Sequence, residues 1–555
     1  MADASCVNPQ NGFCSKIKVF HSLRSPAPLP PPSQPLSITD HTLSLLRSDP
    51  AFSPFTTHFL IDSATGRRLS YSDFIRQFQS LSAALVNKFP TLAKNQVALI
   101  LSPTSIHIPV LYFALLSIGV TVSPVNPLST KSELTDLVGL SNPVIAFATS
   151  SVASKLPSSF PLGTIIIDSP QFLPMLQNHH SNFSSQQVKQ SDTAGILYSS
   201  GTTGRIKGVE LTHRNFIAIT STSYHNRFVK DENSPREHPV SLFPLPLFHV
   251  FGFYMLIRAA SLGETLVLME RFDFENMLKA VEKYKVTYMP VSPPLVVAMA
   301  KSDLVPKYDL SSLLLIGCGG APLGKEVAKS FAARFPNVDI VQGFGMTETG
   351  GGITSMNGPD ECEHHGSAGR LYPNVEAKIV DPETGEALPP MKQGELWLRG
   401  PMIMKGYVRD KESSAATLDS EGWLKTGDLC YFDSDGFLFI VDRLKELIKY
   451  KAYQVAPAEL ERYLQAIPEV ADAAVVPYPD EEAGQIPMAY IVRRPGSKIS
   501  ETQIMEIVAK QACSVSPYKK IRKVAFINAI PKTPAGKILR RELVKHALSR
   551  ASSKL

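Results

Sequence analysis

The sequence predicts an α/β fold, with a large N-terminal domain that contains parallel sheets and a small β-region, followed by a small C-terminal α+β domain. Three observations predict this arrangement. Apolar segments of strand length alternate with segments of helical spacing over most of the chain, which is typical of parallel sheets covered by helices. Residues 381–441 are instead rich in glycine and turns and predict the β-region. After Lys445 the pattern becomes that of a compact mixed unit.

The elements of the large domain follow an N-terminal tail. Residues 1–36 are expected to be a proline-rich tail or surface segment, because six prolines lie between residues 25 and 36 and proline suits neither a helix interior nor a central strand. The large domain is expected over residues 37–441, with helices near residues 108–116 and 274–285. Its expected strands are residues 96–101, 143–147, 164–167, 265–268, 286–289, 312–316 and 339–341, with a further strand at 394–399 in the β-region.

The C-terminal domain is expected over residues 446–552, after a hinge at residues 442–445. Residues 473–476 and 488–492 are predicted strands, and a helix is predicted from Ser500 to about Cys513 because Ser500 and Gln503 form a capping box. The chain ends in Ser553-Lys554-Leu555, a tripeptide that the peroxisomal import receptor recognises at a free C-terminus. The expected location is therefore the peroxisome, with the cytosol as the alternative.

Composition and charge exclude several classes of protein. The chain has 555 residues, of which 44% are hydrophobic and 19% charged, as in ordinary soluble proteins with more than one domain. A net charge of +6 is too small at this length to indicate a nucleic-acid partner. The most apolar run, residues 108–122, is short and contains Ser117 and Thr121, so no transmembrane segment is expected. The six cysteines are scattered without metal-ligand spacing and are expected to be free thiols.

A loop rich in glycine and hydroxyl residues follows an apolar segment at residues 194–197. The backbone N–H groups of such a loop can converge on an anion, while hydroxyls donate to phosphate oxygens and a lysine adds positive charge. It differs from a Walker A loop because Ile206 precedes Lys207 and Gly208 follows it. We interpret it as a site for the β- and γ-phosphates of a nucleotide, with a plain polar loop as the alternative. The candidate ligands are Ser199, Ser200, Gly201, Thr202, Thr203, Gly204 and Lys207.

The segment at residues 343–348 carries groups suited to the rest of a nucleotide. Phe344 offers a stacking face, Thr347 a hydroxyl, and Glu348 an oxygen ligand for Mg²⁺. Two glycines let the backbone approach a ligand, although a strand-to-turn junction would also have them. These glycines are Gly343 and Gly345.

Two turns add candidate contacts to the base and the ribose. The small residues at 319–322 would let a flat base lie against backbone, and the candidates there are Gly320, Ala321 and Pro322. Asp428 lies in a Thr-Gly-Asp turn, where its carboxylate can accept hydrogen bonds from two vicinal hydroxyls. Each motif taken singly is equally compatible with an ordinary turn.

In this order along the chain, the motifs resemble those of the adenylate-forming superfamily of acyl-CoA synthetases, beetle luciferases and peptide-synthetase adenylation domains. The resemblance covers nearly the whole chain after the tail. Residues 373–380 and 450–461 are most similar to plant 4-coumarate–CoA ligases and their peroxisomal ligase-like relatives. The resemblance implies that Asp428 and Arg443 hold the ribose and that Lys445 is the hinge of a mobile lid. The chain departs from the family at Ile206, where proline is usual, and at Phe344, where tyrosine is usual.

The resemblance also assigns different tasks to two segments of the lid. Lys537, in a Pro/Gly loop at residues 531–540, matches the lysine used for adenylation, where a cation can bridge a carboxylate and the α-phosphate. Lys449 and Gln454 match residues used when the thioester forms. Ala452 replaces a usual glycine, which would cost about 1 kcal/mol if that position needs a positive φ. Taken singly, these segments are compatible with a solvated linker and turn.

The implied function is an ATP-dependent carboxylate–CoA ligase, with ATP and Mg²⁺ as cofactors and coenzyme A as a co-substrate. The acid attacks the α-phosphate of ATP, pyrophosphate leaves, and the thiol of coenzyme A then attacks the acyl-adenylate. Two alternatives remain open: an adenylate-forming enzyme with a different acceptor, and a non-catalytic nucleotide-binding interaction protein. The intact lysines make the second alternative the weaker one.

The acid is not expected to be restricted to hydroxycinnamates. In the resemblance, His249 gates the acyl pocket, and Gly317 stands where hydroxycinnamate ligases have a lysine that meets the ring hydroxyl. Gly320, Gly351 and Gly352 stand where larger residues are usual, whereas Tyr254 stands where asparagine is common and refills part of the space. The alternative is that these glycines only loosen the loop. A buried phenol without a partner costs about 1–3 kcal/mol, whereas extra room favours longer acids by about 0.8 kcal/mol per buried CH₂. The predicted acids are medium- or long-chain fatty acids, jasmonate-precursor acids and cinnamate-type acids. The expected pocket residues are Val250, Phe251, Tyr254, Gly317, Gly319, Gly320, Gly343, Gly345, Gly351, Gly352 and Ile353.

Overall fold

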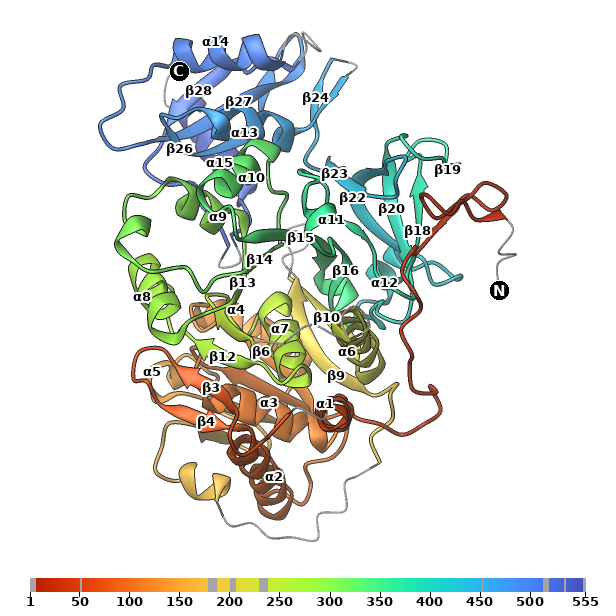
Figure 1. Ribbon diagram of the computed structural model, residues 1–555, viewed down its shortest axis with the longest axis vertical. Helices are drawn as coiled ribbons and strands as arrows, with labels where there is room; N and C mark the ends of the chain where they lie inside the picture. Colours follow the sequence, from red (N-terminus) through yellow and green to blue (C-terminus); the bar gives the residue numbers. More distant parts are fainter. Residues whose placement is uncertain are drawn as a thin grey trace.

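The fold is a large α/β domain that carries a β-rich region on one side and a smaller α+β domain at one end (Figure 1). This arrangement confirms the predicted fold class. It comes from a computed structural model, which describes residues 6–49, 52–177, 187–199, 206–228, 238–451, 453–512, 519–533 and 536–552.

The first sheet of the large domain has the strand order β21-β10-β9-β6-β5-β7-β8. Strands β9, β6, β5, β7 and β8 are parallel, and β10 pairs antiparallel with both β9 and β21. The predicted phosphate loop connects β9 to β10. The strands are β5 (Val97–Leu101), β6 (Thr121–Val125), β7 (Ile145–Ala148), β8 (Thr164–Ile166), β9 (Thr193–Ser199), β10 (Lys207–Thr212) and β21 (Gly406–Tyr407).

The second sheet has the order β17-β16-β15-β14-β13-β11-β12-β3-β4. It is parallel from β15 to β3, with antiparallel pairs at both edges. The strands are β3 (His58–Asp62), β4 (Arg68–Ser70), β11 (Val240–Phe243), β12 (Thr265–Leu268), β13 (Tyr288–Val291), β14 (Leu315–Cys318), β15 (Asp339–Met346), β16 (Gly351–Ser355) and β17 (Arg370–Leu371). The strands predicted for the large domain are thus confirmed, with ends that shift by up to five residues, the largest shift being at the end of β15.

Helices pack on both sheets, and the central ones are buried. Helix α3 is buried along its whole length because its sequence is apolar on every face. Tyr112 of α3 and Phe216 of α6 both pack against Phe253 of α7, at ring separations of 5.1 and 5.2 Å. This packing fixes α7, which contributes a wall of the site. The helices are α1 (Ile38–Ser48), α2 (Tyr71–Lys88), α3 (His107–Ser117), α4 (Lys131–Ser141), α5 (Ser150–Ala153), α6 (His213–Phe228), α7 (Val250–Ser261), α8 (Phe274–Tyr284), α9 (Pro293–Lys301), α10 (Lys325–Arg334), α11 (Pro359–Cys362) and α12 (Lys411–Thr417). Among the described residues, none of the helices combines the length and the apolar character that a membrane span requires.

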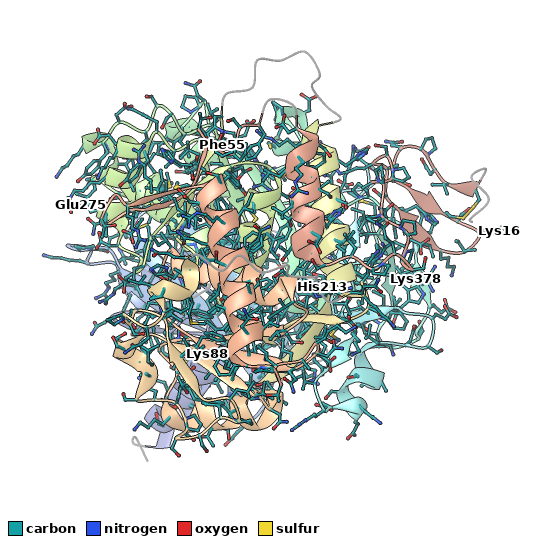
Figure 2. The ribbon with its side chains drawn as sticks, turned by 90° about the horizontal axis from the view of Figure 1, so that it is seen from below. Lys16, Phe55, Lys88, His213, Glu275 and Lys378 are labelled. Carbon is teal, nitrogen blue, oxygen red and sulfur yellow. A yellow bond between two sulfur atoms is a disulfide. The ribbon has the colours of Figure 1, made fainter. Side chains whose placement is uncertain are left out.

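The β-region is a sheet of order β1-β2-β18-β20-β22-β23, with β19 paired to β18. Its first two strands come from the expected N-terminal tail, because Phe20 stacks on Phe432 at 4.4 Å and anchors that segment. The Lys16 hairpin lies at the periphery of the molecule (Figure 2). The strands are β1 (Phe13–Cys14), β2 (Val19–His21), β18 (Glu376–Val380), β19 (Ala387–Leu388), β20 (Gly394–Arg399), β22 (Leu424–Phe432) and β23 (Leu438–Arg443).

A disulfide in this N-terminal segment corrects the expectation of free thiols. Cys6 and Cys14 are bonded, because the chain between them turns back and brings their Cα atoms within 5.2 Å. The turn contains Gly12 at a φ of 75°, where a Cβ would lie 2.1 Å from the carbonyl oxygen of His21. Three other cysteines are free and buried: Cys318, Cys362 and Cys430.

The small domain is a sheet of order β25-β24-β27-β26, with β28 parallel to β27 and three helices. The capping box of α14 is confirmed, since the Gln503 N–H donates to Ser500 Oγ (3.2 Å) and the Ser500 N–H to Gln503 Oε1 (2.9 Å). Lys301 of the large domain donates to the carbonyl oxygens of Gln465 (3.1 Å) and Val470 (3.3 Å), which docks the small domain. The elements are β24 (Ile448–Tyr450), β25 (Tyr453–Val455), α13 (Pro457–Ala466), β26 (Val470–Asp480), β27 (Gly484–Arg493), α14 (Glu501–Ala512), β28 (Lys523–Phe526) and α15 (Arg540–Ser552).

Candidate active site

A cavity of about 1170 Å³ lies where the two sheets of the large domain meet the small domain. Its walls come from β9 and β10, from α7, from β13 to β16, and from the loop that precedes α15. It brings together most of the residues that the motifs predicted, although they are up to 338 positions apart. The predicted residues in the lining are Ser199, Lys207, His249, Val250, Phe251, Tyr254, Gly317, Gly319, Gly320, Gly343, Phe344, Gly345, Thr347, Glu348, Gly351, Gly352, Arg443, Lys445 and Lys537.

Glu348 is the buried carboxylate at the phosphate-loop end of the cavity. It is 6% exposed, and its Oε1 accepts hydrogen bonds from the hydroxyls of Ser199 (3.2 Å) and Tyr407 (3.0 Å). The ammonium of Lys207 lies 4.4 Å from the centre of the Tyr407 ring. Tyr407 therefore contacts the carboxylate of Glu348 through its hydroxyl and the ammonium of Lys207 through its ring. The remaining predicted phosphate ligands, Ser200, Gly201, Thr202, Thr203 and Gly204, lie outside the described residues.

The sequence interpretation missed Tyr407, and no motif pointed to it. Tyr407 reaches the site because β21 pairs with β10, which places it opposite Val209. Burial and the charge of Glu348 raise the pKa of the Tyr407 phenol, so it stays protonated and donates to Glu348. The feature of the sequence that could have indicated Tyr407 is its Gly-Tyr pair in the glycine-rich region.

A second set of charged residues lies where the large domain meets the small one. Asp428 is 3% exposed, and its Oδ1 lies 3.3 Å from Nε of Arg443. Burial raises the pKa of Asp428 to about 6, against the opposing effect of Arg443 and Lys537. Burial and the nearby Arg443 lower the pKa of Lys537 to about 8, while Glu446 and Asp428 oppose this. Lys537 is thus mostly protonated at pH 7.

The loop that carries Lys537 is fixed at both ends. The Lys537 N–H donates to the hydroxyl of Thr533 (3.1 Å) before it. After it, Arg540 bonds Glu446 beside the hinge and both carboxylate oxygens of buried Glu461 (2.8 and 2.7 Å). This bidentate pair ties the start of α15 to α13 and holds Lys537 toward the cavity.

Lys449 and Gln454 are away from the cavity in this arrangement. They face each other across the β24–β25 hairpin, and both are exposed. The Lys449 N–H donates to Gln485 Oε1 (2.8 Å), within the small domain. Ala452, between the two strands, lies outside the described residues.

The hairpin of β15 and β16 carries the 343–348 segment and forms a wall of the cavity. A Cβ on Gly345 would lie 2.0 Å from the carbonyl oxygen of Gly351, so only glycine lets these strands approach. Phe344 is half-buried and lines the cavity next to it. Ala321 and Pro322 are exposed and do not line the cavity, because the chain turns outward at Gly320, which has a φ of 84°.

His249 caps α7 at the entrance to the acyl part of the cavity. Its Nδ1 accepts a hydrogen bond from the Phe251 N–H (3.3 Å). Burial lowers the pKa of His249 to about 4, so the imidazole is neutral at pH 7. The Phe251 ring lies against Gly319, where a Cβ would be 3.5 Å from the ring carbons.

Tyrosines occupy the room that glycines were expected to add to the acyl pocket. A Cβ on Gly317 would lie 2.5 Å from the Tyr288 hydroxyl, and a Cβ on Gly351 would lie 2.9 Å from Cγ of Tyr254. The expectation of extra room and of a lost polar group is therefore wrong at Gly317, whereas Tyr254 fills the space beside Gly351 as the sequence indicated. The glycines permit aromatic side chains from β13 and α7 to fill the space, and Tyr288 brings a hydroxyl that sequence interpretation missed.

Ile353 is a further correction to the predicted pocket. Successive side chains of a strand point to opposite faces. Ile353 is fully buried in the core and, unlike Gly352 and Thr354 on either side of it, does not line the cavity. It supports the wall and does not contact the cavity.

Comparisons with known proteins agree with this geometry. The family model described as AMP-binding enzyme matches residues 50–408, and the AMP-binding enzyme C-terminal domain matches residues 459–537. The chain is 58% identical to 4-coumarate–CoA ligase-like 9 of Arabidopsis thaliana, over 100% of this chain and 99% of that one. It is 45% identical to Peroxisomal OPC-8:0-CoA ligase 1 of Arabidopsis thaliana, over 98% and 99% of the two chains. A solved structure of ATP-bound MatB from Rhodopseudomonas palustris matches with a TM-score of 0.80 at 25% identity, over 92% of this chain and 99% of that one.

Proposed function

This chain belongs to the AMP-binding enzyme family and is an AMP-forming acyl-CoA synthetase, and we propose that the cavity described above carries out both steps of that reaction. The observation that supports this proposal is the position of Lys537. Its small-domain loop places a cation in the same cavity as Glu348 and Arg443 of the large domain, and Asp428 lies behind Arg443, 3.3 Å from its Nε. Such a preorganised site stabilises charge that develops on a phosphate.

In the first step, the carboxylate oxygen of the acid attacks the α-phosphorus of ATP. The new O–P bond forms as the bond from the α-phosphorus to the bridging oxygen breaks, and pyrophosphate leaves with that electron pair. Lys537 stabilises the negative charge on the reacting oxygens. Asp428 accepts hydrogen bonds from the ribose hydroxyls, and Arg443 keeps Asp428 ionised and oriented.

The residues present fit Mg²⁺ at Glu348. The carboxylate is buried, both of its hydrogen bonds end on Oε1, and Oε2 accepts none from the described residues. One carboxylate beside hydroxyls suits an ion that keeps several waters and takes its other ligands from phosphates. When bound there, Mg²⁺ would offset the charge of the phosphates, while Lys207 holds their outer oxygens.

In the second step, the small domain rotates about Lys445 and turns a different face toward the cavity. Lys537 then leaves the cavity, and the β24–β25 hairpin brings Lys449 and Gln454 toward it. The thiol of coenzyme A attacks the acyl carbonyl, a C–S bond forms, and the C–O bond to AMP breaks. The exposed positions of Lys449 and Gln454 on the hairpin support this proposal.

The acid is proposed to be a medium- or long-chain fatty acid, a jasmonate-precursor acid or a cinnamate-type acid. The lining residues of α7 beyond His249, which extend from Val250 to Arg258, support this range. Import into peroxisomes through Ser553-Lys554-Leu555 is proposed as well, and the tripeptide lies outside the described residues.

The test is a two-part assay across these three classes of acid. ATP–pyrophosphate exchange reports the first step, and AMP release that depends on coenzyme A reports the second. Exchange without thioester formation would favour a different acceptor. Absence of exchange with every acid would contradict the proposed function.

A further inference from the structure

The acyl part of the cavity is lined along one face of α7. Phe251, Tyr254, Met255 and Arg258 all line it, at the spacing that places residues on one side of a helix. From Phe251 to Arg258 this face covers ~10 Å at the helical rise per residue. The cavity therefore continues well past His249, and its far end contains Arg258.

The far end has polar groups from three elements. Nη1 of Arg258 lies 3.0 and 3.2 Å from the two carboxylate oxygens of Glu264, which is 1% exposed on its side chain. The guanidinium lies over the Tyr288 ring, 5.0 Å from its centre. The Tyr254 hydroxyl is within 2.5 Å of the Ser223 hydroxyl. This polar far end, consisting of Ser223, Tyr254, Arg258 and Tyr288, lines the cavity.

The Tyr288 hydroxyl is the group in this set that is left for a ligand. Among the described residues it has no hydrogen-bond partner, whereas the Tyr254 hydroxyl is paired with Ser223. Burial raises the pKa of the Tyr288 phenol, so it is a protonated donor at pH 7. The guanidinium of Arg258 has N–H groups beyond the Nη1 group that contacts Glu264.

The charge of Arg258 is balanced by a carboxylate. Arg258 is matched by Glu264 at 3.0 Å. Two further charged side chains of the cavity lining, Arg227 at the end of α6 and Asp339 at the start of β15, are opposite in sign. A second carboxylate would therefore meet no surplus positive charge, while an uncharged oxygen would gain a donor without that cost.

We propose that the far end of the acyl cavity binds an uncharged oxygen of the acid, a carbonyl or a hydroxyl, with the Tyr288 hydroxyl as the specificity-determining donor. This inference rests on the proposed ligase function and names its substrate class: acids with an oxygen at the end remote from the carboxylate. A ring hydroxyl and a ketone are two sources of the same chemistry. Gly317 is the residue that makes room for the donor.

The test compares kcat/KM within matched pairs of acids. One pair is cinnamate and 4-coumarate, and another is an aliphatic acid and the same acid with a remote ketone. A third comparison uses the dicarboxylic acid of equal length. The wild-type enzyme should prefer the oxygen-bearing member of at least one pair by about 3- to 10-fold, the range for one neutral hydrogen bond, and should disfavour the dicarboxylic acid.

Tyr288→Phe should remove this preference by lowering kcat/KM for the oxygen-bearing acid to about that for the unsubstituted acid. Gly317→Ala should weaken it as well, because the new methyl group displaces the Tyr288 hydroxyl that lies 2.5 Å away. Tyr308→Phe is the matched control, since the Tyr308 hydroxyl donates to Glu275 (2.7 Å) outside the cavity. Loss of the preference in one pair only would support the proposal and identify the source of the oxygen.

Two results would overturn the proposal. One is a wild-type enzyme that favours the unsubstituted acid in both pairs, and the other is a Tyr288→Phe enzyme that loses activity equally on both members of a pair. ATP–pyrophosphate exchange with any of these acids keeps the ligase function intact in either case. A lack of exchange with all of them would instead contradict the proposed function itself.

Discussion

The substitution Lys537→Ala separates catalysis from stability in this enzyme. Losing one preorganised stabiliser of transition-state charge costs about 10²- to 10³-fold in rate, and pyrophosphate release should fall by that factor. Burial lowers the pKa of Lys537 from 10.5 to about 8. At 1.36 kcal/mol per pKa unit, this lowering corresponds to about 3 kcal/mol of unfavourable free energy for the charged form. The alanine variant should therefore be no less stable than the wild type.

The pH dependence of the wild-type enzyme follows from the same shift. The first step needs the protonated amine, so pyrophosphate release should decline as the pH rises through about 8. The free energy of unfolding has the opposite pH dependence and rises with pH, because the Lys537 amine has a lower pKa in the folded state than in the unfolded chain. The destabilisation is complete below pH 8 and is relieved between pH 8 and 10.5. Lys537→Arg keeps its charge in this range and should lack the decline.

The assay measures the two steps separately. ATP–pyrophosphate exchange reports adenylate formation, and thioester formation from supplied acyl-adenylate, without ATP, reports the second step. Lys537→Ala should lose the first and retain the second. Lys532→Ala is the control on the same loop, since Lys532 pairs with Asp472, and it should retain both. An equal loss of both steps in Lys537→Ala, or a fall in its midpoint of thermal unfolding, would refute the reasoning.

Three further predictions concern the lid and the C-terminus. Lys449→Ala should leave pyrophosphate exchange near the wild-type rate and slow thioester formation, and a collapse of exchange would contradict the two-face lid. Arg540→Ala should destabilise the small domain by about 3–5 kcal/mol, because it leaves the buried carboxylate of Glu461 without its bidentate partner; urea unfolding measures this, and an unchanged midpoint would contradict it. Removal of Leu555 should leave a fluorescent fusion with an exposed C-terminus in the cytosol without changing activity, whereas continued peroxisomal import would rule out the tripeptide as the signal.

The motifs could be found from the sequence because each is local. A loop of glycines and hydroxyls, a carboxylate after a strand and a lysine after a glycine have their chemistry within a few residues. The cavity brings Ser199, Glu348, Arg443 and Lys537 together as that chemistry requires. Sequence interpretation was weaker for Ala321 and Pro322, which share a motif with Gly320 but lie on the exposed side of its turn.

Residues that act across the fold had no such signal. Tyr407 contacts Glu348 only because β21 pairs with β10. The disulfide of Cys6 and Cys14 depends on a turn at Gly12 that their spacing of eight does not specify. Both depend on backbone pairing between segments, and pairing partners cannot be deduced from either segment alone.

The sequence by itself determined the α/β class and the family, and it supplied the residues proposed to contact ATP, because periodicity and short motifs are properties of consecutive residues. Only the tertiary structure decided the character of the acyl pocket. A glycine in the sequence shows that a side chain is absent, but the tertiary structure decides which neighbouring side chain fills the space. Here Tyr288 and Tyr254 reach it from β13 and α7, since close packing leaves no such space empty. The pocket expected to be wider and less polar is thus lined by phenol groups beside Arg258.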